Sequence, residues 1–386
     1  MSLSSSPVIA SAPDSYKGAL DALGVAKAIA SGIGEVLPGA SFRLIPMADG
    51  GEGSAAAWAD AVGAELITTT ASDPLGRPVE ASFAFSRADS TAVIEMASAS
   101  GLPLLAPDER NPLLASTAGT GDLIRKALDL GAHKIVLCIG GSATNDAGTG
   151  MATALGARFL DADGKPLPHG GGALSQLATI DLAQLDPRLK DATFEVACDV
   201  TNPLCGPTGA SAVYGPQKGA SEADVALLDT ALAHLANVAE QQLGVPAELA
   251  TRPGAGAAGG LGYGLAAFLH ATFRRCVEMI AEQVGLADKL ADCDLVITGE
   301  GRTDSQTVNG KTPAGVAAVA KKFDLPVIVI CGCVGKGYET VHNIGVDVVC
   351  PVAHGFFDPA DPSRGAVERI RACAVEVGHM LALNRR

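Results

Sequence analysis

Aromatic residues are scarce in this sequence: phenylalanine, tryptophan and tyrosine make up 4% of its 386 residues. Hydrophobic residues nevertheless account for 48% of the chain and 46 residues are glycine, so the core must be built from Ala, Val, Leu and Ile. This composition is typical of parallel sheets covered by helices of small residues. Because a single core stops growing at roughly 250–300 residues, we expect two domains.

Basic residues are also few. The sequence has 28 basic residues against 42 acidic ones, which gives a formal net charge of −14. A protein of this charge repels the phosphates of nucleic acids and the headgroups of anionic membranes, so neither is an expected partner. An anionic small-molecule substrate then requires a local pocket of basic side chains.

Signals for secretion, membrane insertion and disulfide bonding are missing. The N-terminus has no basic segment followed by an apolar run, and no stretch of about 18 uncharged apolar residues occurs. The 9 cysteines include no C-x-x-C pair, and several lie within apolar runs, as buried thiols of a reducing compartment do. The sequence therefore predicts a cytoplasmic protein.

Familiar catalytic motifs are absent as well. The 7 histidines show no H-E-x-x-H or other zinc-binding spacing, and no G-x-S-x-G elbow of a serine hydrolase occurs. The first predicted strand lacks the G-x-G-x-x-G of a dinucleotide-binding fold. The segment 294–313 contains Gly-Lys-Thr near its end, but the Walker pattern requires a glycine where Ser305 stands. Another loop must therefore hold the phosphates of a bound nucleotide.

Apolar runs alternate with amphipathic helical segments at both ends of the chain. Strands are predicted from the runs "PVIASAPD", "FRLIPMADGGEG", "DLVITGEG", "PVIVICGC" and "DVVCPVAHG". A helix with apolar residues three and four apart follows the first strand, and the last helix is predicted over residues 366–383. This alternation predicts an α/β fold with a doubly wound, mostly parallel sheet and right-handed crossovers.

The middle of the chain has a different pattern. The run "VEASFAFS" alternates with a period of two and "FLDADGKPL" carries an Asp-Gly turn, so antiparallel hairpins are expected. A helix is predicted from Ser221 to Gly244, with Ser221 as its N-cap. We therefore assign residues 1–65 and 289–386 to one discontinuous Rossmann-like domain, and residues 66–288 to an inserted mixed α+β domain.

Loops rich in Gly, Asp, Asn, Ser and Lys follow several of the predicted strands. They are "APDSYKG" (12–18), "MADGGEG" (47–53), "IGGSATNDAG" (139–148), "ACDVTNPLCGP" (197–207) with "GPQKGAS" (215–221), and "TGEGRTD" (298–304). Each alone is more typical of a turn. Their repetition indicates a site, because ligands of doubly wound sheets lie beyond the carboxyl ends of the strands.

The loop at 139–148 is the best candidate for holding phosphates. Gly140 and Gly141 allow the main chain to approach an anion closely, and Ser142 adds a hydroxyl donor. A helix expected to begin near Asp146 would add free amides and a positive dipole end. Capping of that helix by Asn145 or Asp146 is a structural alternative, and both roles are compatible.

Charged residues of these loops are candidates for binding anions, holding Mg²⁺ and accepting a proton. The basic candidates are Lys17, which follows Asp14 and Ser15, and then Lys218, Arg302 and Lys311. The acidic candidates are Asp49, Glu52, Asp199, Glu300 and Asp304. Phosphoryl transfer from a nucleotide needs Mg²⁺ held by one or two carboxylates and a further carboxylate that accepts the proton of the attacking hydroxyl. Solvation is the alternative for each lysine or arginine, and turn formation is the alternative for Asp199 and Asp304.

Together, the loops resemble those of one family, the type I glycerate kinases. The matching segments, in the family's order, are "APDSYKGAL", "PMADGGEGS", "IGGSATNDAGTGM", "ACDVTNPLCGPTGAS", "VYGPQKGA", "GAGAAGGLGYGLAAFL", "DLVITGEGRTDSQTVNGKTPAGVA" and "PVIVICG". Tyr16, Ser54 and Ala147 stand where the family often has Phe, Thr and Gly, and none of these changes removes a charged group. The resemblance implies phosphorylation of D-glycerate by ATP and Mg²⁺, with 2-phosphoglycerate as the product. It also implies two α/β domains and an active site in the cleft between them.

Residue roles follow from the chemistry of the side chains. We expect Lys17 or Arg302 to bind the carboxylate of glycerate near Asp14 and Ser15, with Lys17 also acting in catalysis. The predicted phosphate-binding residues are Gly140, Gly141, Ser142, Asn145 and Lys218, and the predicted Mg²⁺ ligands are Glu300 and Asp304. Asp199 is the predicted base.

Other functions stay open at this point. A kinase that gives the 3-phospho product or acts on a related hydroxy acid is one alternative, and a non-catalytic sensor of a small carboxylate is another. The oligomeric state is also open, a homo-oligomer included.

Overall fold

The computed structural model describes residues 4, 6–16, 18–48, 53–352 and 363–383. The chain divides into two compact units. The first unit comprises Met1–Asp49, Ala56–Gly63 and Arg275–Arg386, and the second comprises Gly50–Ala55 and Ala64–Arg274. Each unit has its own sheet and its own hydrophobic core.

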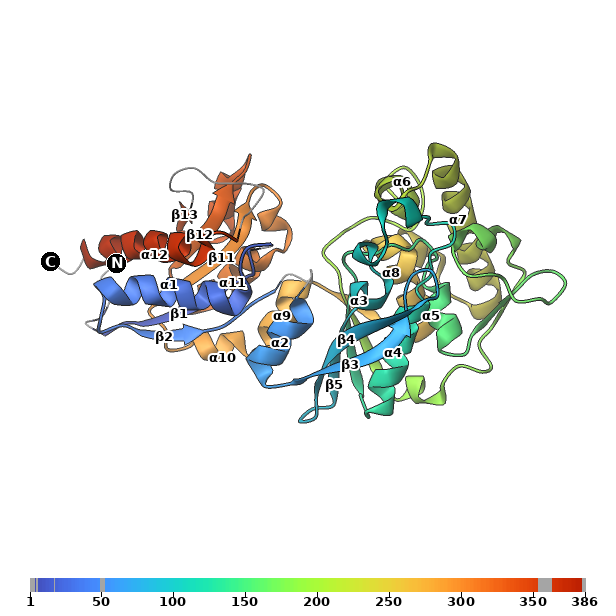
Figure 1. Ribbon diagram of the computed structural model, residues 1–386, viewed down its shortest axis with the longest axis horizontal. Coiled ribbons are helices and arrows are strands. Elements are labelled where there is room, and N and C mark those ends of the chain that lie inside the picture. The colour runs from blue at the N-terminus through green and yellow to red at the C-terminus, as the bar shows by residue number, and fades with distance from the viewer. Residues whose placement is uncertain (1–3, 5, 17, 49–52, 353–362, 384–386) are drawn as a thin grey trace. The chain divides into compact units, whose positions relative to one another are not determined.

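The first unit contains a parallel sheet of 5 strands (Figure 1). In spatial order the strands are β13 (Val348–Pro351), β12 (Val327–Val334), β11 (Leu295–Thr303), β1 (Val8–Pro13) and β2 (Ser41–Leu44). Every neighbouring pair is parallel. Because β1 pairs with β11, the sheet joins segments from opposite ends of the chain.

Helices cover both faces of this sheet. α1 (Ala22–Val36), α11 (Thr312–Ala320) and α12 (Ala366–Leu383) contact its strands. The unit also contains α9 (Cys276–Gln283), α10 (Leu286–Leu290) and residues 56–62 of α2 (Ser54–Val62). Apolar side chains of α1 and α12 form one core with Ile297 and Ile330 of the sheet. Val296 and Val329 alternate with these isoleucines and are also fully buried, while α11 packs against β1, β11 and β12. Strands buried on both faces are typical of a doubly wound sheet.

The helices α9 and α10 pack against α11 and so belong to the first unit. The packing is close, because a Cβ on Gly315 of α11 would lie 2.2 Å from a methyl carbon of Val277 in α9. The predicted domain boundary between residues 288 and 289 lies within α10, whereas the unit resumes at Arg275, before α9.

The second unit contains a mixed sheet of 6 strands. Their spatial order is β10 (Thr272–Arg274), β9 (Thr193–Ala197), β6 (Lys134–Cys138), β5 (Thr91–Glu95), β4 (Pro78–Ser86) and β3 (Glu65–Ser72). The strands from β10 to β5 are parallel to one another, and β3, β4 and β5 pair antiparallel. A separate antiparallel pair joins β7 (Arg158–Leu160) and β8 (Thr179–Asp181).

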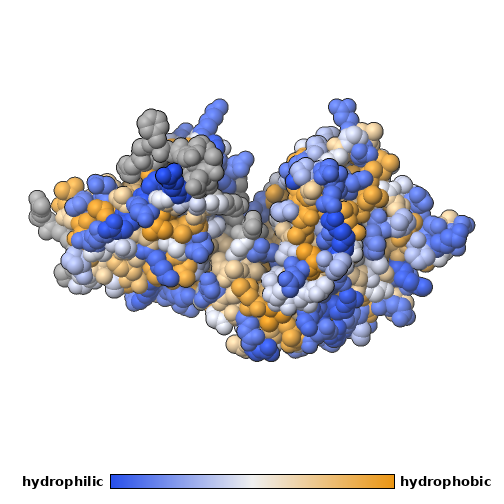
Figure 2. Space-filling model, viewed as in Figure 1, coloured by the Kyte–Doolittle hydropathy of each residue, from blue (hydrophilic) through white to orange (hydrophobic). Residues whose placement is uncertain are grey.

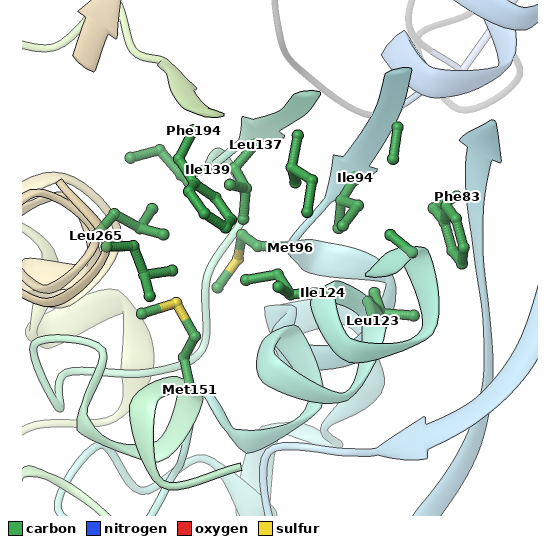
Figure 3. Close-up of a cluster of buried hydrophobic side chains, with 14 of the residues drawn as sticks. Phe83, Ile94, Met96, Leu123, Ile124, Leu137, Ile139, Met151, Phe194 and Leu265 are labelled. Carbon is green, nitrogen blue, oxygen red and sulfur yellow. The ribbon is translucent and has the colours of Figure 1, made fainter. Parts of the chain in front are cut away.

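Aliphatic side chains, methionines and a few phenylalanines fill the core beside the mixed sheet. Figure 3 shows Phe83 and Ile94 from the strands facing Leu123 and Ile124 of α4 (Ala118–Asp129). α5 (Thr149–Ala154) and α8 (Ala257–Leu269) contribute Met151 and Leu265 to the same cluster. This cluster underlies the carboxyl end of β6, where the predicted phosphate loop begins.

A second cluster in this unit surrounds α7 (Glu222–Leu243). Ser221 and Asp224 form a capping box at its start, and Gly244 ends it in the left-handed conformation with φ of 69°. The helix predicted from Ser221 to Gly244 is therefore confirmed.

The α/β fold and the mostly parallel sheet are confirmed, and so are the antiparallel strand from "VEASFAFS" and the last helix. The prediction of a loop at 298–304 is wrong, because β11 continues to Thr303. The glycines in this segment suggested a loop, but pairing of Arg302 with Cys333 and of Thr303 with Val334 extends the ladder with β12.

No helix among the described residues is both long and apolar enough to span a bilayer. Figure 2 shows hydrophilic and hydrophobic residues interspersed on the visible faces of both units. Exposed large hydrophobic residues, such as Leu66, Leu114 and Leu383, come from separate elements. Isolated apolar residues of this kind are ordinary on protein surfaces.

Candidate functional site

Polar side chains gather near the carboxyl ends of strands in each unit. We call the group around Glu300 in the first unit the Glu300 cluster; it contains Asp14, Ser15, Glu300, Thr303, Asp304, Thr307, Lys311 and Thr312. We call the group beneath the loop after β6 in the second unit the Lys218 cluster; it contains Ser142, Thr144, Asn145, Ser211 and Lys218.

Asp14 connects the end of β1 to the start of α11. Its carboxylate is 7% exposed and accepts a hydrogen bond of 2.7 Å from the hydroxyl of Thr312, which is 298 residues away in the chain. The other carboxylate oxygen accepts a bond of 2.6 Å from the amide of Ser15. Two of the four predicted substrate-binding residues, Asp14 and Ser15, therefore lie beside α11. The third, Lys17, lies outside the described residues, as do Asp49 and Glu52.

Glu300 is buried in the same cluster, with 6% of its surface exposed. One carboxylate oxygen accepts hydrogen bonds of 3.0 Å from Thr303 and 2.7 Å from Thr307. The other lies 3.5 Å from the side-chain nitrogen of Lys311. Burial raises the pKa of the Glu300 carboxyl above its ordinary value, and the bonds from Thr307 and Lys311 act in the opposite direction.

Lys311 also lies 3.8 Å from a carboxylate oxygen of Asp304, so Glu300 and Asp304 face one cationic group. Their carboxylates supply the hard oxygen ligands that Mg²⁺ prefers, within reach of one point. The residues present therefore fit the predicted metal pair in donor chemistry, and in this structure the ammonium of Lys311 neutralises them. Within the described ranges, no group of three or more His, Cys, Asp or Glu side chains is arranged to hold a metal ion.

Arg302 lies at the rim of this cluster. Its side chain is 65% exposed, and its Nε lies 3.3 Å from the second carboxylate oxygen of Asp304. A guanidinium held at one side and otherwise open to solvent is available to a carboxylate ligand.

The loop after β6 is fixed to the chain segment that follows β5. The amide of Leu102 donates to the carbonyl oxygen of Gly141 at 2.8 Å, and the amide of Ala143 donates to that of Ser100 at 3.0 Å. Gly141 has a φ of 77°, which L side chains rarely adopt. Within the described part of the chain, the amides of Gly140, Gly141 and Ser142 donate no hydrogen bond. These amides are free to bind an anion.

Asp146 has a structural role that corrects one expectation. The following helix α5 begins at Thr149 rather than near Asp146, because Ala147 and Gly148 have positive φ values of 48° and 75°. The buried carboxylate of Asp146 accepts bonds from the amides of Gly148 and Gly150, and also from Thr117. The N-cap residue of α5 is Gly148, so Asp146 binds amides of the helix start from a position before the cap. This helix start therefore does not offer the free amides that were expected.

Lys218 lies directly beneath the loop. It is 1% exposed, and its side-chain nitrogen donates to the hydroxyl of Ser142 at 2.8 Å and to the carbonyl oxygen of Thr144 at 2.6 Å. Burial lowers the pKa of the Lys218 amine to about 7, and the nearby Asp146 acts in the opposite direction. Solvation, the alternative for a lone lysine, does not apply to Lys218.

Further buried polar atoms in this cluster lack a partner. The side chain of Asn145 donates to the hydroxyl of Ser211 at 2.8 Å, but no donor among the described residues reaches its Oδ1. The hydroxyl of Thr144 is also buried and has no hydrogen bond to any described residue. Buried polar atoms are nearly always paired in proteins, so this cluster has unused capacity for a ligand or for water.

Asp199 follows β9, the parallel neighbour of β6. The register of these strands ends with Cys138 opposite Ala197, and the chain continues from there to Gly140 and to Asp199 at the same edge of the sheet. Asp199 is partly buried. The preceding residue, Cys198, is not a reactive thiol, because burial raises its pKa to about 11.

Sequence reasoning missed the threonines that hold Glu300 and Asp14. Thr303, Thr307 and Thr312 are each fully buried and donate to one of these carboxylates. Their signal was Thr303 within the predicted loop, Thr307 shortly after it and the threonine of the Gly-Lys-Thr. Nothing in the local pattern indicated which carboxylate each would reach.

Comparison with known proteins gives full-length matches. The model described as the glycerate kinase family matches residues 9–382. The protein named glycerate kinase from Bacillus subtilis (strain 168) is 48% identical over 372 residues, which cover 96% of this chain and 97% of that protein. The protein named glycerate 2-kinase from Escherichia coli (strain K12) is 47% identical over 375 residues, which cover 97% and 98% of the two chains. A crystal structure from Salmonella typhimurium LT2, whose description names glycerate kinase 2, matches with a TM-score of 0.90 and 45% identity, covering 98% of this chain and 99% of that one.

Proposed function

Because the chain belongs to the glycerate kinase family, we propose that it transfers a phosphoryl group from ATP to D-glycerate and forms 2-phosphoglycerate. In this reaction the C2 hydroxyl oxygen attacks the γ-phosphorus, the bond to ADP breaks and the hydroxyl proton leaves to a base. The observation that carries the proposal is the free amide loop at Gly140–Ser142 with the buried amine of Lys218 beneath it.

The Lys218 cluster is the proposed site for the phosphates of ATP. Main-chain amides of Gly140, Gly141 and Ser142 bind phosphate oxygens, and the positive charge of Lys218 offsets part of their negative charge. Asn145 holds the loop through Ser211 and offers one unpaired oxygen. Donors fixed before the ligand arrives stabilise charge without a cost of reorganisation.

The Glu300 cluster is the proposed site for Mg²⁺ and glycerate. Glu300 and Asp304 would hold the cation, which would neutralise negative charge on the phosphates during transfer. The carboxylate of glycerate pairs with Arg302 or Lys17, near Asp14 and Ser15. Displacement of Lys311 from the two carboxylates would free its ammonium to contact a phosphate.

Asp199 is the proposed base. A loose phosphoryl-transfer transition state depends on positioning and charge neutralisation more than on strong proton abstraction, so Asp199 needs no raised pKa. The two units would then serve as the domains of one enzyme, with transfer in the cleft between them and with closure excluding water from the γ-phosphate. Small-angle scattering profiles that do not change when both substrates are added would contradict closure.

A coupled assay tests the proposed function. ADP release with D-glycerate is followed through pyruvate kinase, and the product is offered to enolase with and without phosphoglycerate mutase. We expect Mg²⁺-dependent ADP release and a product that enolase consumes without the mutase. A product that requires the mutase would indicate the 3-phospho isomer, and tight glycerate binding without turnover would indicate a sensor.

A further inference from the structure

Arg110 carries a positive charge that no side chain of the described residues neutralises. Most described arginines pair with a carboxylate; Arg43 pairs with Asp292 and Arg371 with Glu35, for example. No hydrogen bond or ion pair from another described residue reaches the Arg110 guanidinium, and its Nε is buried without a partner. The adjacent Glu109 does not neutralise it, because that carboxylate pairs with Arg77 at 2.6 Å.

The position of Arg110 links it to the Lys218 cluster. Its main chain packs against Gly219, where a Cβ would lie 2.4 Å from the carbonyl oxygen of Arg110 and 3.2 Å from its Cβ. Gly219 has a φ of 95° and directly follows Lys218. A left-handed glycine thus lets the backbone of Arg110 approach the turn that carries the buried lysine.

The chain segment that contains Arg110 is attached to the phosphate loop on both sides. Before Arg110, the amide of Leu102 donates to Gly141; after it, Thr117 donates twice to Asp146 at 2.9 Å. Residues 102–117 therefore pass alongside the loop and contact the turn of Lys218 on the way. This attachment fixes Arg110 relative to the predicted phosphate site.

A partly buried guanidinium without an acceptor is costly unless a ligand satisfies it. Asp146, the carboxylate that interacts with Lys218, already accepts bonds from Thr117, Gly148 and Gly150. In a protein with a net charge of −14, an arginine that pairs with no described carboxylate, and whose backbone contacts the turn of Lys218, fits an anion that arrives from solution. The planar guanidinium binds two oxygens of a phosphate or a carboxylate at once, which a lysine cannot reproduce.

We propose that Arg110 is an additional binding residue of the site and holds an anionic oxygen group of the reactants. The proposal rests on the proposed function, and the oxygen group has two sources: the phosphates of ATP and the carboxylate of glycerate. Sequence reasoning passed over Arg110 because no glycine-rich loop contains it.

Calorimetric titration of the full chain tests this assignment, with non-hydrolysable ATP plus Mg²⁺ in one arm and D-glycerate in the other. Arg110→Ala should weaken one of the two ligands by about 10- to 100-fold and leave the other within about twofold. If only the affinity for the nucleotide falls, Arg110 binds a phosphate group of ATP. If only the affinity for D-glycerate falls, Arg110 binds the carboxylate of glycerate. Arg110→Lys should recover little of the loss, because the bidentate geometry is absent.

The matched control is Arg87→Ala, which removes an exposed arginine that pairs with Glu65 at 2.9 Å. It should change neither affinity. Thermal melts check folding, and if Arg110→Ala does not fold, Arg110→Lys decides the question through the same titrations. Affinities within about twofold of the wild type for both ligands in a folded Arg110 variant would overturn the proposal. Binding is measured without turnover, so an inactive wild type would contradict the proposed function alone.

Discussion

The side-chain nitrogen of Lys218 lies 2.8 Å from the hydroxyl oxygen of Ser142, although 76 residues separate the two in the chain. A second bond of 2.6 Å to the carbonyl oxygen of Thr144 holds the loop after β6 from below. The lysine is 1% exposed, so these bonds are shielded from solvent. A cation and a loop with free amides are therefore fixed together before a ligand binds, which is the requirement for a preorganised phosphate site.

Replacement of this lysine should weaken nucleotide binding. Lys218→Met keeps a long apolar stem but removes the charge and both hydrogen bonds, so the affinity for ATP with Mg²⁺ should fall by about 10- to 100-fold. Isothermal titration calorimetry measures the change. Lys165→Met serves as the control, because Lys165 is 75% exposed and pairs with the exposed Asp163. Unchanged ATP affinity in a folded Lys218→Met variant would remove this residue from the phosphate site.

Nucleotide affinity should depend on pH through the same lysine. The pKa of the Lys218 amine is about 7 in the folded protein, well below its ordinary value of 10.5, because of burial. A bound phosphate favours the charged amine, so binding above pH 7 takes up a proton and affinity falls as pH rises, by up to about tenfold per unit. Titrations between about pH 6.5 and 9 should show this slope in the wild type and a smaller slope in Lys218→Met. Equal slopes would show that another group controls the pH dependence.

Asp199→Asn should reduce turnover with little effect on stability. The amide keeps the shape of the side chain but accepts a proton poorly, so kcat should fall by about 10²- to 10⁴-fold. The melting temperature should stay near that of the wild type. Asp191→Asn, at an exposed position between η4 (Pro187–Lys190) and β9, is the matched control. A kcat close to the wild-type value would exclude Asp199 as the base.

Glu300→Gln and Asp304→Asn should each raise the concentration of Mg²⁺ needed for half-maximal activity, by roughly tenfold. A neutral amide offers one ligand oxygen without the charge that attracts a divalent cation. The measurement is the rate at fixed ATP and glycerate over a range of Mg²⁺ concentrations. Glu248→Gln, at an exposed position, should leave the curve in place. An unshifted curve in both site variants would place the metal ligands elsewhere.

Asp146→Asn should destabilise the second unit. Thr117 donates twice to the Asp146 carboxylate, and the amides of Gly148 and Gly150 also donate to it, in a fully buried position. An amide places a donor where one of these acceptors stood, so the free energy of unfolding should fall by about 2–4 kcal/mol. Urea denaturation measures this value. Asp224→Asn at the start of α7 should cost about 1 kcal/mol or less, because the capping pair is exposed. A loss for Asp146→Asn no larger than that control would contradict the structural role.

Local patterns were sufficient to predict much of the fold. Ser221 and Gly244 mark the ends of α7 because capping and left-handed termination depend on residues within one turn. The extension of β11 through Gly299 and Gly301 was not predictable in the same way. Its stability depends on pairing with β12, which lies about 30 residues further along the chain.

In the candidate site, too, local features could be predicted from the sequence and long-range contacts could not. The glycines at 140 and 141 allowed an anion-binding loop to be predicted from the sequence, because backbone freedom is a local property. The burial of Lys218 and the bond between Asp14 and Thr312 depend on contacts between distant segments, and no local pattern contains that information. Arg110, which we propose as a further binding residue, was overlooked because no glycine-rich loop contains it.

Crystals of the protein grown with Mg²⁺, a non-hydrolysable ATP analogue and D-glycerate give the most direct test of the phosphate site. We predict triphosphate density within hydrogen-bond distance of the amides of Gly141 and Ser142, with the Lys218 amine close to a phosphate oxygen. Triphosphate density bound at another loop, with these amides still solvated, would contradict the account.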